Sequence, residues 1–147
     1  MQQPTPSTPK SSFLPTPAML WQLMQTIWLG SHIAALLLFI PLLNKIGFAP
    51  ILVQEVQNQL RPALLVMTIM ASAVQMLVLV RVEGMSALIR QLRGQLLLAA
   101  WLLALLTLLG FGKGLFNADI LRAMYGAMLG CGLVLLAQIA PSNQNTN

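Results

Sequence analysis

The 147-residue sequence predicts an all-α integral membrane protein, a four-helix bundle with a short interfacial helix after the first span. Only 7% of the residues are charged and 57% are hydrophobic, whereas a soluble domain usually has about 25% charged residues. The apolar residues gather in four runs, each near the ~20 residues that a helix needs to cross a ~30 Å hydrocarbon layer. Helices are expected because lipid offers no hydrogen-bond partners to an open backbone.

The first segment of the chain predicts a disordered tail. Residues 1–17, "MQQPTPSTPKSSFLPTP", hold five of the nine prolines and few large apolar side chains. Such a segment buries too little surface to offset the entropy of ordering it. The apolar run that follows is too long for the core of a signal peptide, so we expect the tail to stay attached.

The membrane domain is expected over residues 18–141, followed by a polar tail at 142–147. Within it, the apolar runs place the four spans at about 19–43, 63–82, 95–112 and 120–140. Prolines 41, 62 and 141 lie near the ends of these runs, where proline is tolerated.

The longest link, between the first two spans, contains an amphipathic stretch. In "APILVQEVQNQL", residues 49–60, the apolar residues fall on one helical face and most of the amides on the other. This pattern predicts a short helix lying in the membrane interface, with Pro50 in its first turn. The alternative is an extension of the second span beyond Pro62.

The positive charge is typical of topology signals. The net charge is +5, but the basic residues are spread thinly at the edges of the apolar runs, which argues against a nucleic-acid partner. Four basic residues fall on each side of the predicted membrane domain. The densest group lies in "RVEGMSALIRQLRG", residues 81–94, and it favours both termini in the cytoplasm. The absence of an Asn-x-Ser/Thr site is compatible with a bacterial inner-membrane protein.

The only histidine, His32, lies near the middle of the first span, where an ionisable group is costly. Gln25 precedes it on the same span, and Gln75 and Tyr125 are candidate partners on other spans. One interpretation is an interhelical hydrogen bond that holds the bundle together. Others are a proton- or ligand-handling role and metal ligation.

Soft metal ligands share one face of the fourth span. Met124, Met128 and Cys131 follow each other at helical spacing, and thioether with thiolate and imidazole would suit Cu(I). Methionine is also an ordinary filler of apolar helices. We therefore expect no bound metal, with copper as a minor alternative.

Small residues predict close helix contacts. Gly126 and Gly130 form a GxxxG pattern on the fourth span, and Gly30 with Ala34 forms a small-xxx-small pair on the first. Such residues let helix backbones approach each other. We expect the tightest contacts on the first and fourth spans, either within one chain or between two copies.

No motif of an enzyme is present. The sequence has no HExxH, P-loop or GxSxG pattern and no carboxylate pair within a span. Asp119 fits a helix N-terminus, and Arg122 can reach the lipid headgroups. We expect neither an enzyme nor a cofactor.

Two stretches resemble the DUF4149/TMEM205-like family of small four-span membrane proteins. They are "WLGSHIAALLLFIPLL", residues 28–43, and "LRAMYGAMLGCGLVLL", residues 121–136, in which Arg122, Tyr125 and Gly126 match the start of that family's last span. The link before the last span is shorter here than is usual in that family. The resemblance implies four helices and no established biochemical activity.

These observations predict a non-enzymatic membrane protein, an accessory or scaffolding component that assembles through its small-residue helix faces. Its expected partners are the lipid bilayer and either a second copy or another membrane protein. The alternative is a small transporter or channel-like carrier that uses His32 with Gln25, Gln75 or Tyr125. A carrier needs His32 to face a wet cavity, whereas a scaffold needs it packed and paired.

Overall fold

The protein folds as a bundle of helices. The structure is a computed structural model that describes residues 16–114 and 116–138. Its elements, in chain order, are α1 (Pro17–Ala34), the π-helical segment η1 (Ala35–Phe39), α2 (Ile40–Ile46), α3 (Pro50–Glu83), α4 (Met85–Arg90), α5 (Leu92–Lys113) and α6 (Ala118–Leu136). Four continuous helical stretches are long and apolar enough to cross a membrane: 17–46, 50–83, 92–113 and 119–136. The predicted all-α, four-helix membrane bundle is confirmed, and the chain is a multi-pass membrane protein.

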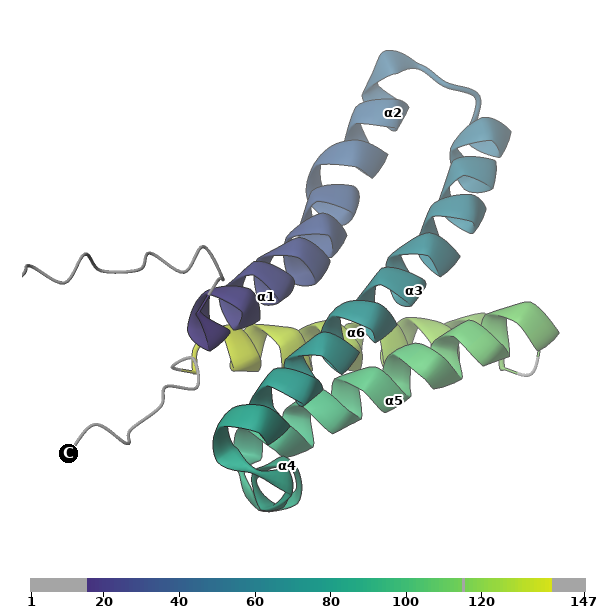
Figure 1. Ribbon diagram of the computed structural model, residues 1–147. Coiled ribbons are helices and arrows are strands. Elements are labelled where there is room, and N and C mark those ends of the chain that lie inside the picture. Colours follow the sequence, from purple (N-terminus) through teal and green to yellow (C-terminus); the bar gives the residue numbers. More distant parts are fainter. Residues whose placement is uncertain (1–15, 115, 139–147) are drawn as a thin grey trace, which may run out of the picture.

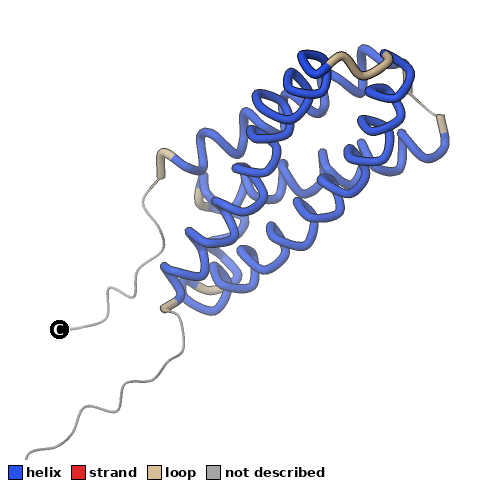
Figure 2. The backbone as a smooth tube through the Cα atoms, turned by 90° about the horizontal axis from the view of Figure 1, so that it is seen from above, coloured by secondary structure: helices blue, strands red, loops and turns tan. Residues whose placement is uncertain are grey.

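The four spans pair as two helical hairpins. α1, with η1 and α2, runs beside α3, and α5 runs beside α6 (Figure 1). The two hairpins are joined where α3 packs on α5, and the short helix α4 fills the corner between them. Figures 1 and 2 show that α1 begins on the same side of the bundle as the end of α6. An even number of spans requires this arrangement.

The first span begins at a capped end. The hydroxyl of Thr16 accepts a hydrogen bond from the Met19 backbone at 3.3 Å, and Pro17 occupies the first turn, where its missing N–H costs nothing. Thr16 and Pro17 therefore belong to the start of α1. The remainder of the predicted N-terminal tail, residues 1–15, and the predicted polar tail at 142–147 lie outside the described residues.

A widened turn interrupts the first span. Pro41 has no backbone N–H and its ring collides with the carbonyl of residue 37, so the regular α-helical bond pattern cannot run through it. The chain switches to the π-helical pattern just before, and Ile40 N–H bonds to the carbonyl of Ala35, five residues back. The span continues as α2 to Gly47, whose φ of 87° closes the helix.

The predicted interfacial helix is wrong, and the alternative interpretation holds. Residues 50–60 form the first turns of α3, a single helix of 34 residues with Pro62 in its interior. The carbonyl that Pro62 leaves without a partner belongs to Asn58, which is exposed among other polar residues, so the break is tolerated. At 1.5 Å per residue α3 is about 51 Å long. It exceeds the ~30 Å hydrocarbon layer, and its polar first turns are the excess.

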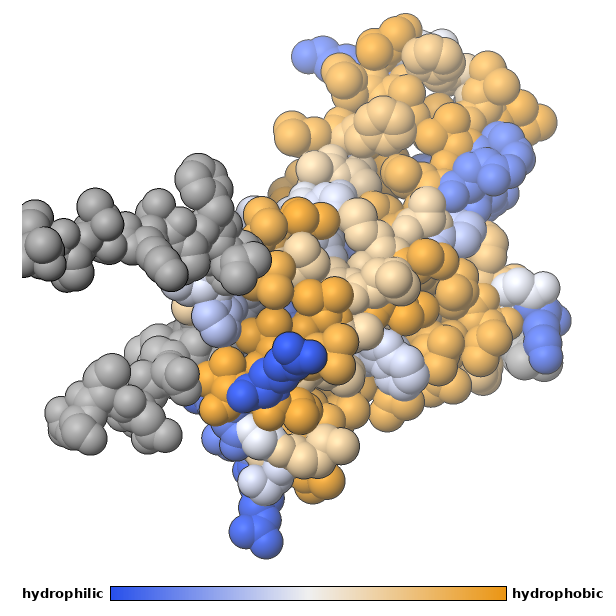
Figure 3. Space-filling view, viewed as in Figure 1, coloured by the Kyte–Doolittle hydropathy of each residue, from blue (hydrophilic) through white to orange (hydrophobic). Residues whose placement is uncertain are grey.

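The core lies where α1, α3, α5 and α6 meet. Near the ends of the chain it contains Trp21, Leu79, Leu97 and Leu135, all almost completely buried. The outside of the bundle is largely apolar, as the space-filling view shows (Figure 3). Leu37 is 70% exposed, for example, and such side chains are suited to contact lipid.

Candidate functional site

Most of the buried polar residues lie on one face of α1 and one face of α3. Gln25, Trp28 and His32 follow each other at three- and four-residue spacing, so they point to the same side of α1. Ser72 and Gln75 of α3 face inward as well. All five are buried, with exposed fractions of 2% or less. The opposite sides of both helices are apolar and suited to lipid, so the polar face is directed toward the bundle interior.

Two glutamine amides tie three helices together in what we call the amide cluster, comprising Gln25, Trp28, Gln75 and the backbone carbonyls of Trp21 and Gly132. Gln75 Nε2 donates to Gln25 Oε1 at 2.7 Å and to the Trp21 carbonyl at 3.2 Å. Trp28 Nε1 donates to Gln75 Oε1 at 3.2 Å. Gln25 Nε2 donates to the carbonyl of Gly132 on α6 at 2.9 Å. The cluster therefore links α1, α3 and α6, and such bonds contribute about 0.6 kcal/mol each in membrane bundles.

His32 lies one turn beyond the amide cluster and is completely buried. Its Nδ1 is 2.7 Å from the Trp28 carbonyl, which can only accept, so Nδ1 carries the proton. In the neutral ring Nε2 is then an acceptor, and within the described residues it has no hydrogen-bond partner. The Tyr125 ring lies against it, with 5.3 Å between ring centroids. His32 thus bonds to its own helix, and its contact with α6 is a ring contact.

The structure brings together all four candidate polar residues, but in two groups. Gln25 and Gln75 bond to each other, while the rings of His32 and Tyr125 meet in a tilted contact. The sequence analysis missed Gly132, which supplies the carbonyl on α6. Its only signal in the sequence was that it is a third glycine in the fourth apolar run, after Gly126 and Gly130.

The small residues predicted to make close contacts do not make them within the described chain. Gly30, Ala34 and Gly126 are exposed. A Cβ placed on Gly30, Gly126 or Gly130 would meet nothing within 4 Å. Of the two alternatives, close contacts of these pairs within one chain are therefore not found, and contacts between two copies stay a prediction.

Gly132 makes the close contact between α1 and α6. A Cβ at this position would run into the Trp28 indole ring, and it would also press on Leu29. α6 otherwise packs chiefly on α5. The indole ring is large, so only the residue without a side chain fits beneath it.

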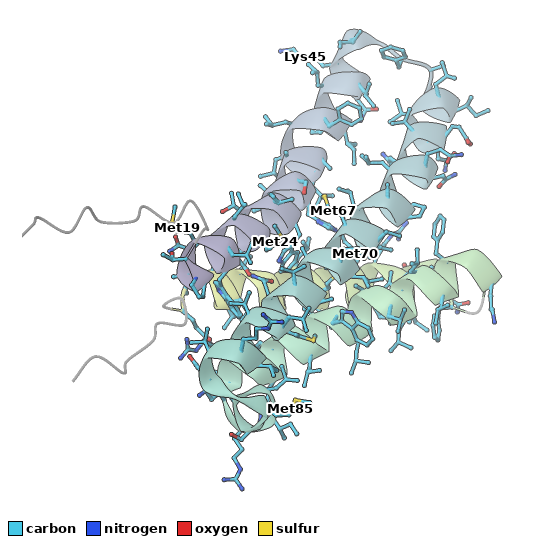
Figure 4. The ribbon with its side chains drawn as sticks, in the orientation of Figure 1. Met19, Met24, Lys45, Met67, Met70 and Met85 are labelled. Atoms are coloured by element: carbon cyan, nitrogen blue, oxygen red, sulfur yellow. The ribbon has the colours of Figure 1, made fainter. Side chains whose placement is uncertain are left out.

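The soft-ligand residues of α6 are packed as apolar side chains. Met128 is completely buried against Leu65, Ala100 and Ala104, and Cys131 adjoins the same cluster. Met19 and Met85 lie well apart on α1 and α4 (Figure 4). Over residues 16–114 and 116–138 the structure contains no group of three His, Cys, Asp or Glu side chains that could hold a metal ion. Copper binding stays a minor hypothesis from the sequence.

A lateral cavity of about 450 Å³ opens between the two hairpins, on the side away from the chain ends. It is lined by residues of η1, α2, α3, α5 and α6, among them Tyr125 and Gly126. Gln25, Gln75 and His32 do not line it. Tyr125 therefore separates the buried histidine from the cavity.

Comparison with protein-family models, curated proteins and solved structures found no match. The resemblance to the DUF4149/TMEM205-like family stays a prediction.

Proposed function

We propose that the protein is a non-enzymatic accessory or scaffolding component of a membrane, which assembles with a second copy or another membrane protein. The observation that supports the proposal most strongly is the burial and mutual hydrogen bonding of the amide cluster. Gln25 and Gln75 are buried, hydrogen-bonded to each other, and absent from the walls of the cavity. Buried amides that satisfy each other's hydrogen bonds stabilise a helical bundle, and they have few free donors or acceptors left to bind a ligand.

The small-residue positions support assembly. Gly30 and Ala34 on α1 and Gly126 on α6 are exposed on the outside of the bundle. A helix of another chain can approach the backbone closely there, and in lipid such close packing drives association. The same residues are not needed for contacts within the described chain, so they are available to contact a helix of a partner.

The test measures self-association in reconstituted vesicles. Copies are labelled at Ser86→Cys in a Cys131→Ser background, and energy transfer between them reports association. Gly30→Leu and Gly130→Leu should each lower energy transfer, because they fill the faces that a second helix would contact. Gly112→Leu is the matched control: a Cβ there also meets nothing within 4 Å. Equal energy transfer in all variants would contradict assembly of two copies through these faces.

A second candidate, a small carrier, is favoured by one observation. His32 Nε2 is buried with no partner among the described residues, and the adjacent Tyr125 lines the cavity. A rotation of the tyrosine would connect the imidazole to the cavity. Intramembrane ionisable residues commonly mark such paths.

The carrier hypothesis is tested with vesicles that enclose a pH-sensitive dye. Proton flux above that of protein-free vesicles, abolished by His32→Leu and kept by Gln22→Leu, would support it. Gln22 is an exposed residue of the same helix. No flux with the wild-type chain would exclude proton movement and leave the accessory role.

The proposed location is a bacterial inner membrane, with both termini in the cytoplasm. The corner at α4 carries Arg81, Arg90 and Arg93, the densest basic group of the chain. An impermeant maleimide should fail to label Ser86→Cys in intact cells and label it after permeabilisation. Labelling in intact cells would reverse the orientation.

A further inference from the structure

The lateral cavity is apolar in its depth. Its inner wall is built by Ala35 of η1, Leu65 of α3, Thr107 of α5 and Leu129 of α6. The Thr107 hydroxyl donates to the Leu103 carbonyl of its own helix at 2.6 Å, so it offers no unsatisfied proton to the cavity. The space exists because small residues, Ala35 and Gly126, occupy positions where larger ones would fill it.

The rim of the cavity is cationic. Arg61 of α3 and Arg122 of α6 both line it, with Gln57 beside Arg61. Arg122 pairs with Asp119 at 3.0 Å, on an exposed surface. Arg61 donates to Gln57 Oε1 at 3.3 Å, and within the described parts of the chain it has no carboxylate partner. The rim thus presents two guanidinium groups with one nearby carboxylate.

The rim lies at the depth of lipid headgroups. Glu83, the last residue of α3, is 22 residues after Arg61, about 33 Å along a helix. That distance matches the ~30 Å thickness of the hydrocarbon layer. If Arg81 and Glu83 lie at one interface, Arg61 therefore lies at the other. α5, 22 residues long, ends at Lys113 on the same side.

The cavity is large enough for a substantial part of a lipid chain. An apolar cavity of about 150 Å³ holds one benzene molecule, so 450 Å³ corresponds to roughly three such groups. From Arg122 to Leu129 the wall descends seven residues of α6, about 10 Å toward the membrane centre. An apolar depth beneath a pair of guanidinium groups matches an amphiphile with an anionic head.

We propose that this cavity binds one acyl chain of an anionic phospholipid of the surrounding bilayer, whose phosphate is held by Arg61 and Arg122. Guanidinium groups bind phosphate through two parallel N–H donors, and they do so best where water is partly excluded. The free chain of the lipid remains in the bilayer outside α2 and α3. This site does not depend on the accessory role, although Gly126 belongs both to the cavity wall and to the small-residue positions of α6.

The test uses the full chain purified in a nonionic detergent. Thermal unfolding is followed while dioleoyl phosphatidylglycerol, dioleoyl phosphatidylcholine or oleate is added. A ligand that binds only the folded state raises the unfolding temperature. Phosphatidylglycerol should raise it more than the other two, and native mass spectrometry should show one retained lipid. Equal shifts with phosphatidylcholine, or a larger shift with oleate, would overturn the proposal.

Two kinds of variant separate the head and the chain of the lipid. Arg61→Gln with Arg122→Gln should weaken phosphatidylglycerol binding roughly tenfold, while Arg90→Gln, an exposed residue of α4, should leave it unchanged. Gly126→Leu should block the chain from the cavity without altering the fold. Gly130→Leu, one turn further along α6 and absent from the cavity wall, is its control. Wild-type binding by both test variants would overturn the site.

Discussion

The amide cluster and the lateral cavity lie in the same four-helix bundle, yet they are built in opposite ways. In the cluster, α1 and α6 are held together by a glycine beneath an indole and by the hydrogen bond from the Gln25 amide to the Gly132 carbonyl. At the cavity, Gly126 and Ala35, which belong to the same two spans, line empty space. A small residue therefore does not by itself bring helices together. A complementary large side chain and a polar link must lie opposite it.

The largest expected effect comes from adding one methyl group at Gly132. Gly132→Ala should lower the free energy of unfolding by about 1–3 kcal/mol, because the new carbon meets the buried Trp28 ring. Gly126→Ala should be neutral or raise stability by up to about 1 kcal/mol, since the site is open and alanine favours helix. Unfolding by SDS in mixed micelles measures both. Equal effects would show that the two glycines do not differ.

Removal of the central amide should cost nearly as much. Gln75→Leu leaves the Trp28 indole N–H and the Gln25 carbonyl oxygen without their partner, which we expect to lower stability by about 1–3 kcal/mol. A double-mutant cycle with Gln25→Leu should give a coupling of about 0.6–1.7 kcal/mol. Gln22→Leu, on the exposed side of α1, should change stability little. Zero coupling would mean that the two amides do not support each other.

His32→Leu should have a smaller effect, within about 1 kcal/mol of the wild type. The substitution loses the bond to the Trp28 carbonyl, but it also removes a buried nitrogen that has no partner in the described structure. The same micelle unfolding assay measures the change. A loss as large as that of Gln75→Leu would show that the imidazole has a second polar contact, and it would favour the accessory role over the carrier hypothesis.

The smallest effect is expected at the rim of the cavity. Without added lipid, Arg61→Gln should change stability by no more than about 0.5 kcal/mol, because the side chain is exposed. Its effect should emerge when phosphatidylglycerol is present. A large loss of stability without lipid would show that Arg61 has a structural role. The contrast between the amide cluster and the cavity would then be smaller.

The class of the protein and the approximate positions of its spans follow from the sequence alone. Composition and the length of apolar runs decide these, because a membrane imposes a fixed thickness and requires helices. The burial of Gln25, His32 and Gln75 was also predictable, since a polar residue inside an apolar run must turn away from lipid.

Which residues contact each other became visible only in the folded bundle. Residues 50–60 could lie in the interface or continue the span, and the structure shows the second because α3 packs as one rod on α1 and α5. Four glycines along α6 and α1 carry the same local signal. Gly132 alone among them lies opposite an indole, because the two spans meet there and diverge toward the cavity. Periodicity fixes the face of a helix, whereas the crossing of two helices fixes the point of contact.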